Sequence, residues 1–207
     1  MIKNLIFDLG GVVMTIDPEE GMRRFEQLGI VDAREQMGAY GQTGIFLESE
    51  NGSISTEEFC EKLAEQAGVM SITYEQAQWG WLGYVKEVPQ NRLNNLLRLK
   101  ENYNVYLLSN TNPFLMKWAK STAFSPDGHS IDYYFHKVFC SYELKDYKPA
   151  ESIYRKVLQA ECLNAEECVF IDDGPANVES AKRVGMQGLL VEKDSDWWDK
   201  LSEILNE

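Results

Sequence analysis

Histidine and cysteine are scarce in this chain of 207 residues, and their scarcity argues against several kinds of site. There are two histidines, His129 and His136, and four cysteines with no Cys-x-x-Cys spacing. A tetrahedral zinc site draws on Cys and His side chains, so the sequence disfavours one. A chain of this length does not need disulfides to hold its core, and we expect all four cysteines to be reduced.

Positive charge and long apolar runs are also lacking. The formal net charge is −13, and no basic run offsets it. Nucleic acids and anionic membranes are bound through clustered Lys and Arg, so neither is an expected partner. No apolar stretch is long enough to span a bilayer, and residues 1–4 run straight into a strand-like segment without a secretory signal. We therefore expect a cytoplasmic protein, while the oligomeric state cannot be predicted.

The sequence does contain enough apolar residues for a packed core, because 44% of the chain is hydrophobic. Short strand-like runs alternate with helical patterns after about residue 89. Such alternation predicts an α/β fold, a Rossmann-like parallel sheet joined by right-handed crossovers. We expect strands at 3–8, 103–109, 137–140, 168–172 and 188–191, and helices at 89–100, from Asn112-Pro113 onward, and at 150–160, 177–184 and 196–205.

Residues 18–88 show helical signals and no convincing strand. Asp17 is placed to cap a helix that Pro18 opens. Ser55 to Glu58 forms a capping box, and Thr73 to Gln76 repeats that pattern ahead of a Trp-rich helix. The stretch interrupts the alternating pattern after its first strand, which predicts an inserted helical cap domain. The expected division is a core of 1–16 and 89–207 with a cap of 17–88.

Polar side chains stand where three of the strand-like runs end. Asp8 follows the first run, Ser109 ends the second, and the adjacent pair Asp172 and Asp173 ends a third. Ligands of open α/β sheets bind outside the carboxyl ends of the strands, so we expect these side chains to line one crevice. Lys148, just before a proline that we expect to open a helix, would complete a site for an anion and a divalent cation.

Each of these features also has an ordinary structural interpretation. Asp8 before Gly10 and Gly11 suits a turn, although glycines also let a backbone approach a ligand and expose its N–H groups. Ser109 and Asn110 offer a hydroxyl and backbone N–H groups for phosphate oxygens, yet the segment also suits helix capping. A single lysine is usually a surface residue.

The pair Asp172 and Asp173 is the most specific of these signals. Adjacent carboxylates at the end of a buried strand repel each other and lose hydration unless a cation compensates them. Mg²⁺ is commonly held by one or two carboxylates together with waters and phosphate oxygens. An Asx turn at Asp173-Gly174 is the alternative, and we favour the metal.

The ordered set resembles the haloacid dehalogenase-like superfamily, whose members are mostly phosphatases. That family's four motifs are matched in chain order by Phe7–Val13, Leu107–Asn110, Lys148-Pro149 and Val169–Asp173. More narrowly, the chain resembles bacterial α-glucose-1-phosphate phosphatases. The shared phrases are Phe-Asp-Leu-Gly, Leu-Ser-Asn-Thr-Asn, Lys-Pro-x-x-x-Ile-Tyr and Asp-Asp-x-x-x-Asn.

The resemblance implies a Mg²⁺-dependent phosphomonoester hydrolase that acts on a small phosphorylated metabolite, such as the sugar phosphate glucose-1-phosphate. Asp8 would attack phosphorus and form an aspartyl-phosphate, which water then hydrolyses. The phosphoryl group would be bound by Gly10, Gly11, Ser109, Asn110 and Lys148. The metal would be bound by Asp8, the backbone carbonyl of Gly10, and Asp172 or Asp173.

One position departs from the family pattern. Most of these phosphatases carry a second Asp two residues after the nucleophile as general acid and base, and here that residue is Gly10. Such catalysis is typically worth about 10²–10⁴-fold. We rank three explanations: a substrate with a good leaving group, another acid such as Asp17 or the histidines, and loss of catalysis. For Asp17 the capping role is favoured.

Loss of catalysis would leave a phospho-ligand sensor on the same fold, and a protein-interaction module is a third class. A 2-haloacid dehalogenase uses the same nucleophile but no metal, and the acidic pair argues against it. The cap is expected to select the substrate. Its turn at Glu48–Gly52 and the aromatic residues Phe46, Trp79 and Trp81 are candidates to reach the cleft. For the aromatic residues we favour the core of the cap, and for Glu48 and Glu50 we favour the solvated surface over a role as sugar ligands.

Overall fold

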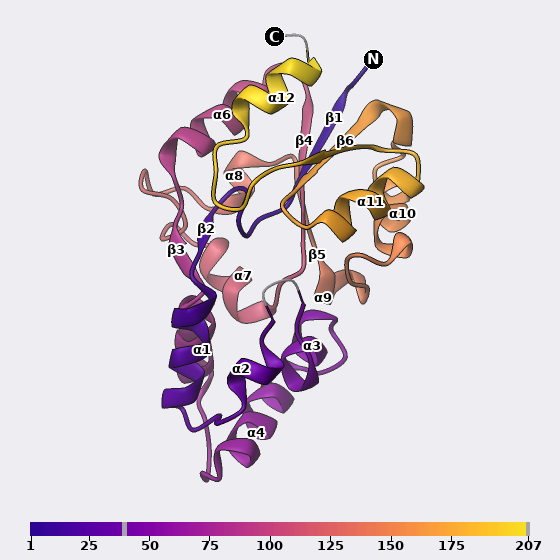
Figure 1. Cartoon of the computed structure of the whole chain (residues 1–207). Coiled ribbons are helices and arrows are strands. Elements are labelled where there is room, and N and C mark those ends of the chain that lie inside the picture. The colour runs from indigo at the N-terminus through magenta and orange to yellow at the C-terminus, as the bar shows by residue number, and fades with distance from the viewer. Residues whose placement is uncertain (39–40, 206–207) are drawn as a thin grey trace.

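The structure, a computed structural model, describes residues 1–38 and 41–205. Five parallel strands form a sheet in the order β5-β4-β1-β6-β7 (Figure 1). This confirms the predicted α/β fold. The strands are β1 (Asn4–Phe7), β4 (Asn104–Ser109), β5 (Lys137–Cys140), β6 (Cys168–Asp172) and β7 (Gln187–Leu190).

Helices cover both faces of this sheet because successive side chains of a strand point to opposite faces. On β1, Leu5 and Phe7 pack with apolar residues of the helices on one face, whereas Ile6 packs with those on the other. The first face carries α6 (Gln90–Lys100), α8 (Ile131–Tyr134) and α12 (Trp198–Leu205). The second carries α10 (Glu151–Ala160) and α11 (Pro175–Arg183).

Five further helices form a layer of their own, away from the end of the molecule where both chain termini lie (Figure 1). They share a separate apolar cluster in which Phe25, Phe46 and Trp81 meet edge to face. On this basis we propose that residues 17–88 are a cap domain. The helices are α1 (Pro18–Gln27), α2 (Ala33–Gln36), α3 (Gly44–Glu50), α4 (Thr56–Ala67) and α5 (Tyr74–Leu82).

The cap packs on the sheet domain through α7 (Pro113–Ala119), which follows β4. Phe114 of α7 is fully buried in the apolar cluster of the cap. Its ring lies 5.3 Å from that of Phe59 and 4.8 Å from that of Tyr74. The segment just after β4 therefore supports the cap as well as the edge of the sheet.

One expectation about residues 18–88 was wrong. Val85–Glu87 form a short strand, β3, which pairs antiparallel with β2 (Thr15–Ile16). The two strands join the sheet domain to the cap on either side of the inserted helices. Both are only partly buried or exposed, so neither has the apolar run from which a buried strand is recognised.

The other predicted elements are present with ends that differ by two residues or fewer. The capping boxes at Ser55 and Thr73 form as expected. Three short helices, α8, α9 (Ser141–Leu144) and the 3₁₀ helix η1 (Ala165–Glu167), were not predicted. Across residues 1–38 and 41–205, no helix is both long and apolar enough to cross a membrane.

Candidate active site

The carboxyl ends of three neighbouring strands bring the predicted residues together. Phe7 of β1 pairs with Leu107 of β4 and with Ile171 of β6, so Asp8, Ser109 and Asp172 lie at one edge of the sheet. A pocket opens there between the sheet and the cap. Its lining includes Asp8, Gly10, Gln42, Glu50, Trp81, Tyr84, Ser109, Asn110, Asn112, Tyr147, Lys148, Asp173 and Asn177.

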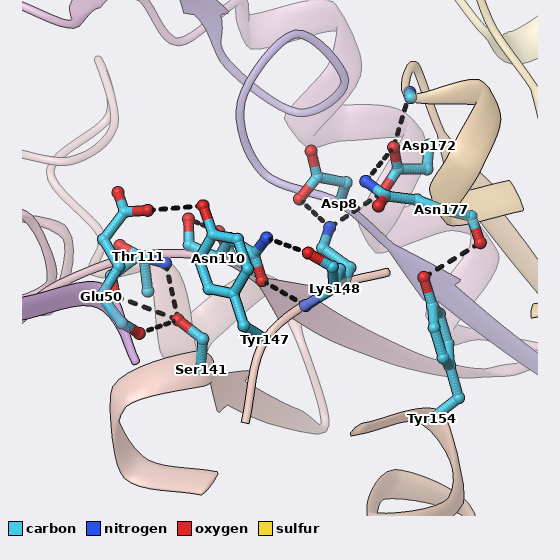
Figure 2. Close-up of polar contacts among 12 residues, drawn as sticks. Asp8, Glu50, Asn110, Thr111, Ser141, Tyr147, Lys148, Tyr154, Asp172 and Asn177 are labelled. Carbon is cyan, nitrogen blue, oxygen red and sulfur yellow. Dashed lines mark hydrogen bonds and ion pairs between the residues drawn. The ribbon is translucent and has the colours of Figure 1, made fainter. Parts of the chain in front are cut away.

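Lys148 is the central cation of this pocket. Its Nζ lies 2.7 Å from Asp8 Oδ1 and 2.8 Å from Asp172 Oδ2, and its side chain is 2% exposed (Figure 2). Burial alone would lower the pKa of Lys148, but the two carboxylates outweigh burial and raise it, so the ammonium stays charged. Because α10 begins at Glu151, the proline after Lys148 precedes the helix and does not open it.

Two amide side chains hold these charged groups in place. Asn110, just after β4, accepts a hydrogen bond from the Lys148 N–H at 2.9 Å and donates one to the Lys148 carbonyl at 3.0 Å. Asn177 donates to both carboxylate oxygens of Asp172, at 3.0 and 3.2 Å. The Gly174 N–H donates to Oδ1 of the same carboxylate at 2.7 Å. The side chain of Asn110 therefore positions Lys148.

Three carboxylates surround the Lys148 ammonium. Oxygens of Asp8, Asp172 and Asp173 all lie within 4.8 Å of one another. Burial raises the pKa of Asp8 to about 7 against the lowering effect of Lys148, and burial with the neighbouring Asp172 raises the pKa of Asp173 to about 6. The cluster has more negative than positive charge, and its oxygens are the donors that a hard divalent cation prefers.

The two glycines after Asp8 have different surroundings. Gly10 lines the pocket, whereas Gly11, among the described residues, does not. The Gly11 N–H donates to the Met14 carbonyl at 2.8 Å, so it is engaged within its own loop. Gly11 has φ +81°, and a Cβ there would lie 2.7 Å from Asp173 Oδ2. Gly11 therefore makes room for the Asp173 carboxylate, and its N–H is not directed into the pocket.

Glu50 was expected on the solvated surface, and the structure contradicts this. Glu50 ends α3, is 6% exposed and lines the pocket. It lies four residues after Phe46, whose ring is buried in the cap, and residues four apart share one face of a helix. The spacing of four residues from a buried aromatic residue was therefore the sequence signal that could have predicted the burial of Glu50. Glu48 is partly exposed, and its carboxylate lies 2.5 Å from Lys62 Nζ.

The aromatic residues of the cap differ in their exposure. Phe46 and Trp81 are fully buried in its core, as expected, although Trp81 also contributes to the pocket. Trp79 is 40% exposed instead, with the Arg24 guanidinium above its ring. Tyr147 lines the pocket beside Lys148, and no sequence pattern predicted this role.

The acids proposed to replace the missing Asp lie elsewhere. Asp17 caps α1 by accepting from the Glu20 N–H at 3.1 Å. His136 Nδ1 accepts from the Val105 N–H at 3.0 Å, and His129 stacks on a tyrosine ring. None of the three is among the described residues that line the pocket. Glu50 is the carboxylic acid that the cap contributes to it.

Comparison with known proteins is consistent with this geometry. Residues 2–185 match the family of haloacid dehalogenase-like hydrolases. D-ribitol-5-phosphate phosphatase of Bacteroides thetaiotaomicron is 40% identical over 206 residues, an alignment that covers 100% of each chain. A solved hydrolase of Porphyromonas gingivalis, predicted to be of this family, is 36% identical with a TM-score of 0.94, covering 100% of this chain and 99% of that one.

A second solved structure adds ligands to the comparison. It is a family enzyme of Bacteroides thetaiotaomicron in complex with magnesium and inorganic phosphate, 34% identical, with a TM-score of 0.88 over 97% of this chain and 99% of that one. The resemblance carried by the four motifs is thereby confirmed, as is the prediction of an enzyme. The chain belongs to the haloacid dehalogenase-like hydrolases.

Proposed function

We propose that the chain is a Mg²⁺-dependent phosphomonoester hydrolase acting on a small phosphorylated sugar alcohol or sugar through an aspartyl-phosphate on Asp8. The observation that carries this is the buried ammonium of Lys148, which lies between Asp8 and Asp172 at the base of the pocket. A structural ion pair would need one carboxylate for one lysine. The additional carboxylates are suited to a metal and to a nucleophile.

The residues of the chain supply most of what phosphoryl transfer needs, which is positioning and charge stabilisation. Asp8 Oδ1 accepts from Lys148, which leaves Oδ2 free to attack phosphorus. Lys148 and the hydroxyl of Ser109 would then bind the oxygens of the transferring group. Because its backbone is held by Asn110, the lysine requires little rearrangement to do so.

The acidic cluster fits a bound Mg²⁺. Both oxygens of Asp172 already accept hydrogen bonds from Lys148, Asn177 or Gly174, whereas Asp173 is only partly buried and lies against Gly11. We therefore assign the direct contact to Asp173, with Asp8 and the Gly10 carbonyl, and the positioning of Lys148 to Asp172. When bound, the ion would offset the carboxylate charge and polarise the phosphoryl oxygens.

The substrate class follows from the cap side of the pocket and from the named relative. Polar side chains of Gln42, Glu50, Asn112 and Tyr147 line that side, together with the rings of Trp81 and Tyr84, and they suit a leaving group with several hydroxyls. The relative acts on a phosphorylated sugar alcohol, so we favour this class over glucose-1-phosphate. The leaving group of such a substrate is a primary alkoxide, which is a poor leaving group. A good leaving group would therefore not explain why Gly10 stands where related enzymes carry an Asp.

The test is phosphate release from D-ribitol 5-phosphate, glucose-1-phosphate and p-nitrophenyl phosphate, with Mg²⁺, with EDTA and with the Asp8→Asn variant. We expect release that requires both Mg²⁺ and Asp8 and is fastest on the sugar-alcohol phosphate. Binding of inorganic phosphate with no turnover of any ester would instead indicate a sensor. Metal-independent chloride release from 2-chloropropionate would indicate a dehalogenase.

A further inference from the structure

The position at which related phosphatases carry their general acid is occupied by Gly10 here, and the space beside it is tight. Gly10 lies beside the side chain of Ile16, and a Cβ at residue 10 would be 3.3 Å from Ile16 Cγ2. A carboxylate at this position would require Ile16 to move. A poor leaving group nevertheless needs a proton as its bond to phosphorus breaks. The donor must therefore come from another part of the pocket.

Glu50 has the surroundings of such a donor. It is a nearly fully buried carboxyl group, and in residues 1–38 and 41–205 it forms no ion pair. An unpaired buried carboxylate is costly, and such groups concentrate at functional sites. The Tyr147 hydroxyl donates to Glu50 Oε2 at 2.9 Å (Figure 2), and the side chain of Asn112 also faces this carboxyl group.

The core holds this cap residue by its backbone. The Ser141 hydroxyl accepts from the Thr111 N–H at 2.9 Å and donates to the Glu50 carbonyl at 2.5 Å. Two residues later the chain turns at Gly52, with φ +73°, where a Cβ would lie 2.2 Å from the Tyr142 carbonyl oxygen. The end of α3 is therefore docked directly on the loop after β4 and on α9. Its carboxyl group has a defined place relative to Asp8.

The direction of attack places the leaving group on this side of the pocket. Asp8 and Lys148 lie at the sheet, and Glu50 with Tyr147 lies at the other end of the polar network (Figure 2). In phosphoryl transfer the attacking and leaving oxygens are roughly in line, so the leaving oxygen departs away from Asp8, toward the cap. We propose that Glu50 is the general acid and base of this enzyme, acting on the leaving oxygen and then on the hydrolytic water.

In the first step Asp8 Oδ2 forms a bond to phosphorus, and the bond from phosphorus to the leaving oxygen breaks. The electron pair stays on that oxygen, which takes the proton of the Glu50 carboxyl group and departs as an alcohol. In the second step the Glu50 carboxylate takes a proton from water. The water oxygen bonds to phosphorus, the bond to Asp8 breaks, and both side chains return to their starting states.

The neighbours of Glu50 allow it to hold a proton near neutral pH. Burial raises the pKa of Glu50 to about 7; the negative charge of Asp8 adds to this, while Tyr147 and Lys148 oppose it. Tyr84 also faces the group. Burial raises the pKa of both tyrosines, so they remain protonated donors. Tyr147 is a positioning residue that holds one Glu50 oxygen.

This inference rests on the proposed function and is tested with Glu50→Gln, an isosteric change that removes the exchangeable proton. We expect kcat/KM for D-ribitol 5-phosphate to fall by about 10²-fold or more. For p-nitrophenyl phosphate we expect kcat/KM to stay close to that of the unmodified enzyme, because p-nitrophenolate departs without a proton. Hydrolysis of the aspartyl-phosphate should also slow, giving a burst of p-nitrophenolate followed by slow turnover.

Glu48→Gln is the matched control, since Glu48 lies on the same helix but is only partly buried, is paired with Lys62 and does not line the pocket. It should change neither substrate's kcat/KM. Thermal unfolding of both variants checks that they fold, and Glu50→Asp, which keeps an acid, should retain more activity than Glu50→Gln if the latter is unstable.

Two results would overturn the assignment. An equal fall of kcat/KM on both substrates would make Glu50 a structural residue, and a rise in KM with kcat unchanged would make it a hydroxyl-binding residue. If the unmodified enzyme releases phosphate from no ester, the proposed function itself fails.

Discussion

The buried carboxyl group of Glu50 makes the stability of the protein depend on pH in a defined direction. Its pKa is raised from 4.5 to about 7, chiefly by burial, and the side chain is 6% exposed. Each unit of pKa corresponds to about 1.4 kcal/mol, so the rise in the Glu50 pKa changes the free energy of unfolding by about 3 kcal/mol between low and high pH. The unfolded chain releases this proton at a lower pH than the folded protein. The contribution of the protonated Glu50 side chain to the free energy of unfolding is therefore fully present below about pH 4.5 and is lost as pH rises through 7.

Glu50→Gln removes this titration while keeping the shape of the side chain. We expect the unfolding free energies of the two proteins to lie closest at pH 5, and the unmodified protein to lose up to about 3 kcal/mol relative to the variant by pH 8. Urea unfolding at both pH values, in EDTA, measures the difference, and groups common to both proteins largely cancel. Glu48→Gln should show no such change. An equal difference at pH 5 and pH 8 would refute the reasoning, because the carboxyl group would then titrate as if exposed.

Three further predictions concern the phosphate and metal groups. Asn110→Ala removes two hydrogen bonds to the Lys148 backbone, at about 1 kcal/mol each. Urea unfolding should therefore show a loss of about 2 kcal/mol in the free energy of unfolding, and kcat should fall. An unchanged kcat would show that Asn110 does not position the lysine. Gly11→Ala places a methyl group against Asp173 at φ +81° and should weaken the activation of the enzyme by Mg²⁺. Gly128→Ala is the control, because it has a similar φ of +80° but open space around it, and it should affect stability alone. Equal Mg²⁺ titrations of activity for the two variants would contradict this. Because Mg²⁺ binds the folded state, adding it should raise the melting temperature, with a smaller rise in Asp8→Asn, and the absence of any rise would count against the metal site.

Much of the sheet and of its polar edge could be predicted from the sequence because both depend on short local patterns. Buried parallel strands are continuous apolar runs, and polar residues at their ends meet at one edge of the sheet. The closeness of Asp8, Ser109 and Asp172 follows from that rule alone. The position of Lys148 does not, because it depends on a loop held by Asn110. Lys148 was a candidate because it stands just before a proline, and the resemblance to known motifs added its role.

The unpredicted features depend on contacts between distant segments. The β2–β3 ribbon joins segments about seventy residues apart in the chain, and neither has a strand-like pattern of its own. Glu50 is polar, so composition placed it in solvent, whereas its burial results from the docking of α3 on Ser141. Gly11 was assigned to phosphate because glycines often serve that purpose, and its neighbour is the Asp173 side chain instead. The cytoplasmic location remains a prediction.

The contact between Ser141 and Glu50 separates two properties that a single residue often combines. The serine hydroxyl binds the main-chain carbonyl of residue 50, a group that every amino acid carries. This main-chain contact is thus independent of the side chain at position 50, while the chemistry presented to the substrate depends on that side chain. Substitutions at position 50 can therefore change the leaving-group preference and still keep the contact with Ser141, although they lose the hydrogen bond from Tyr147.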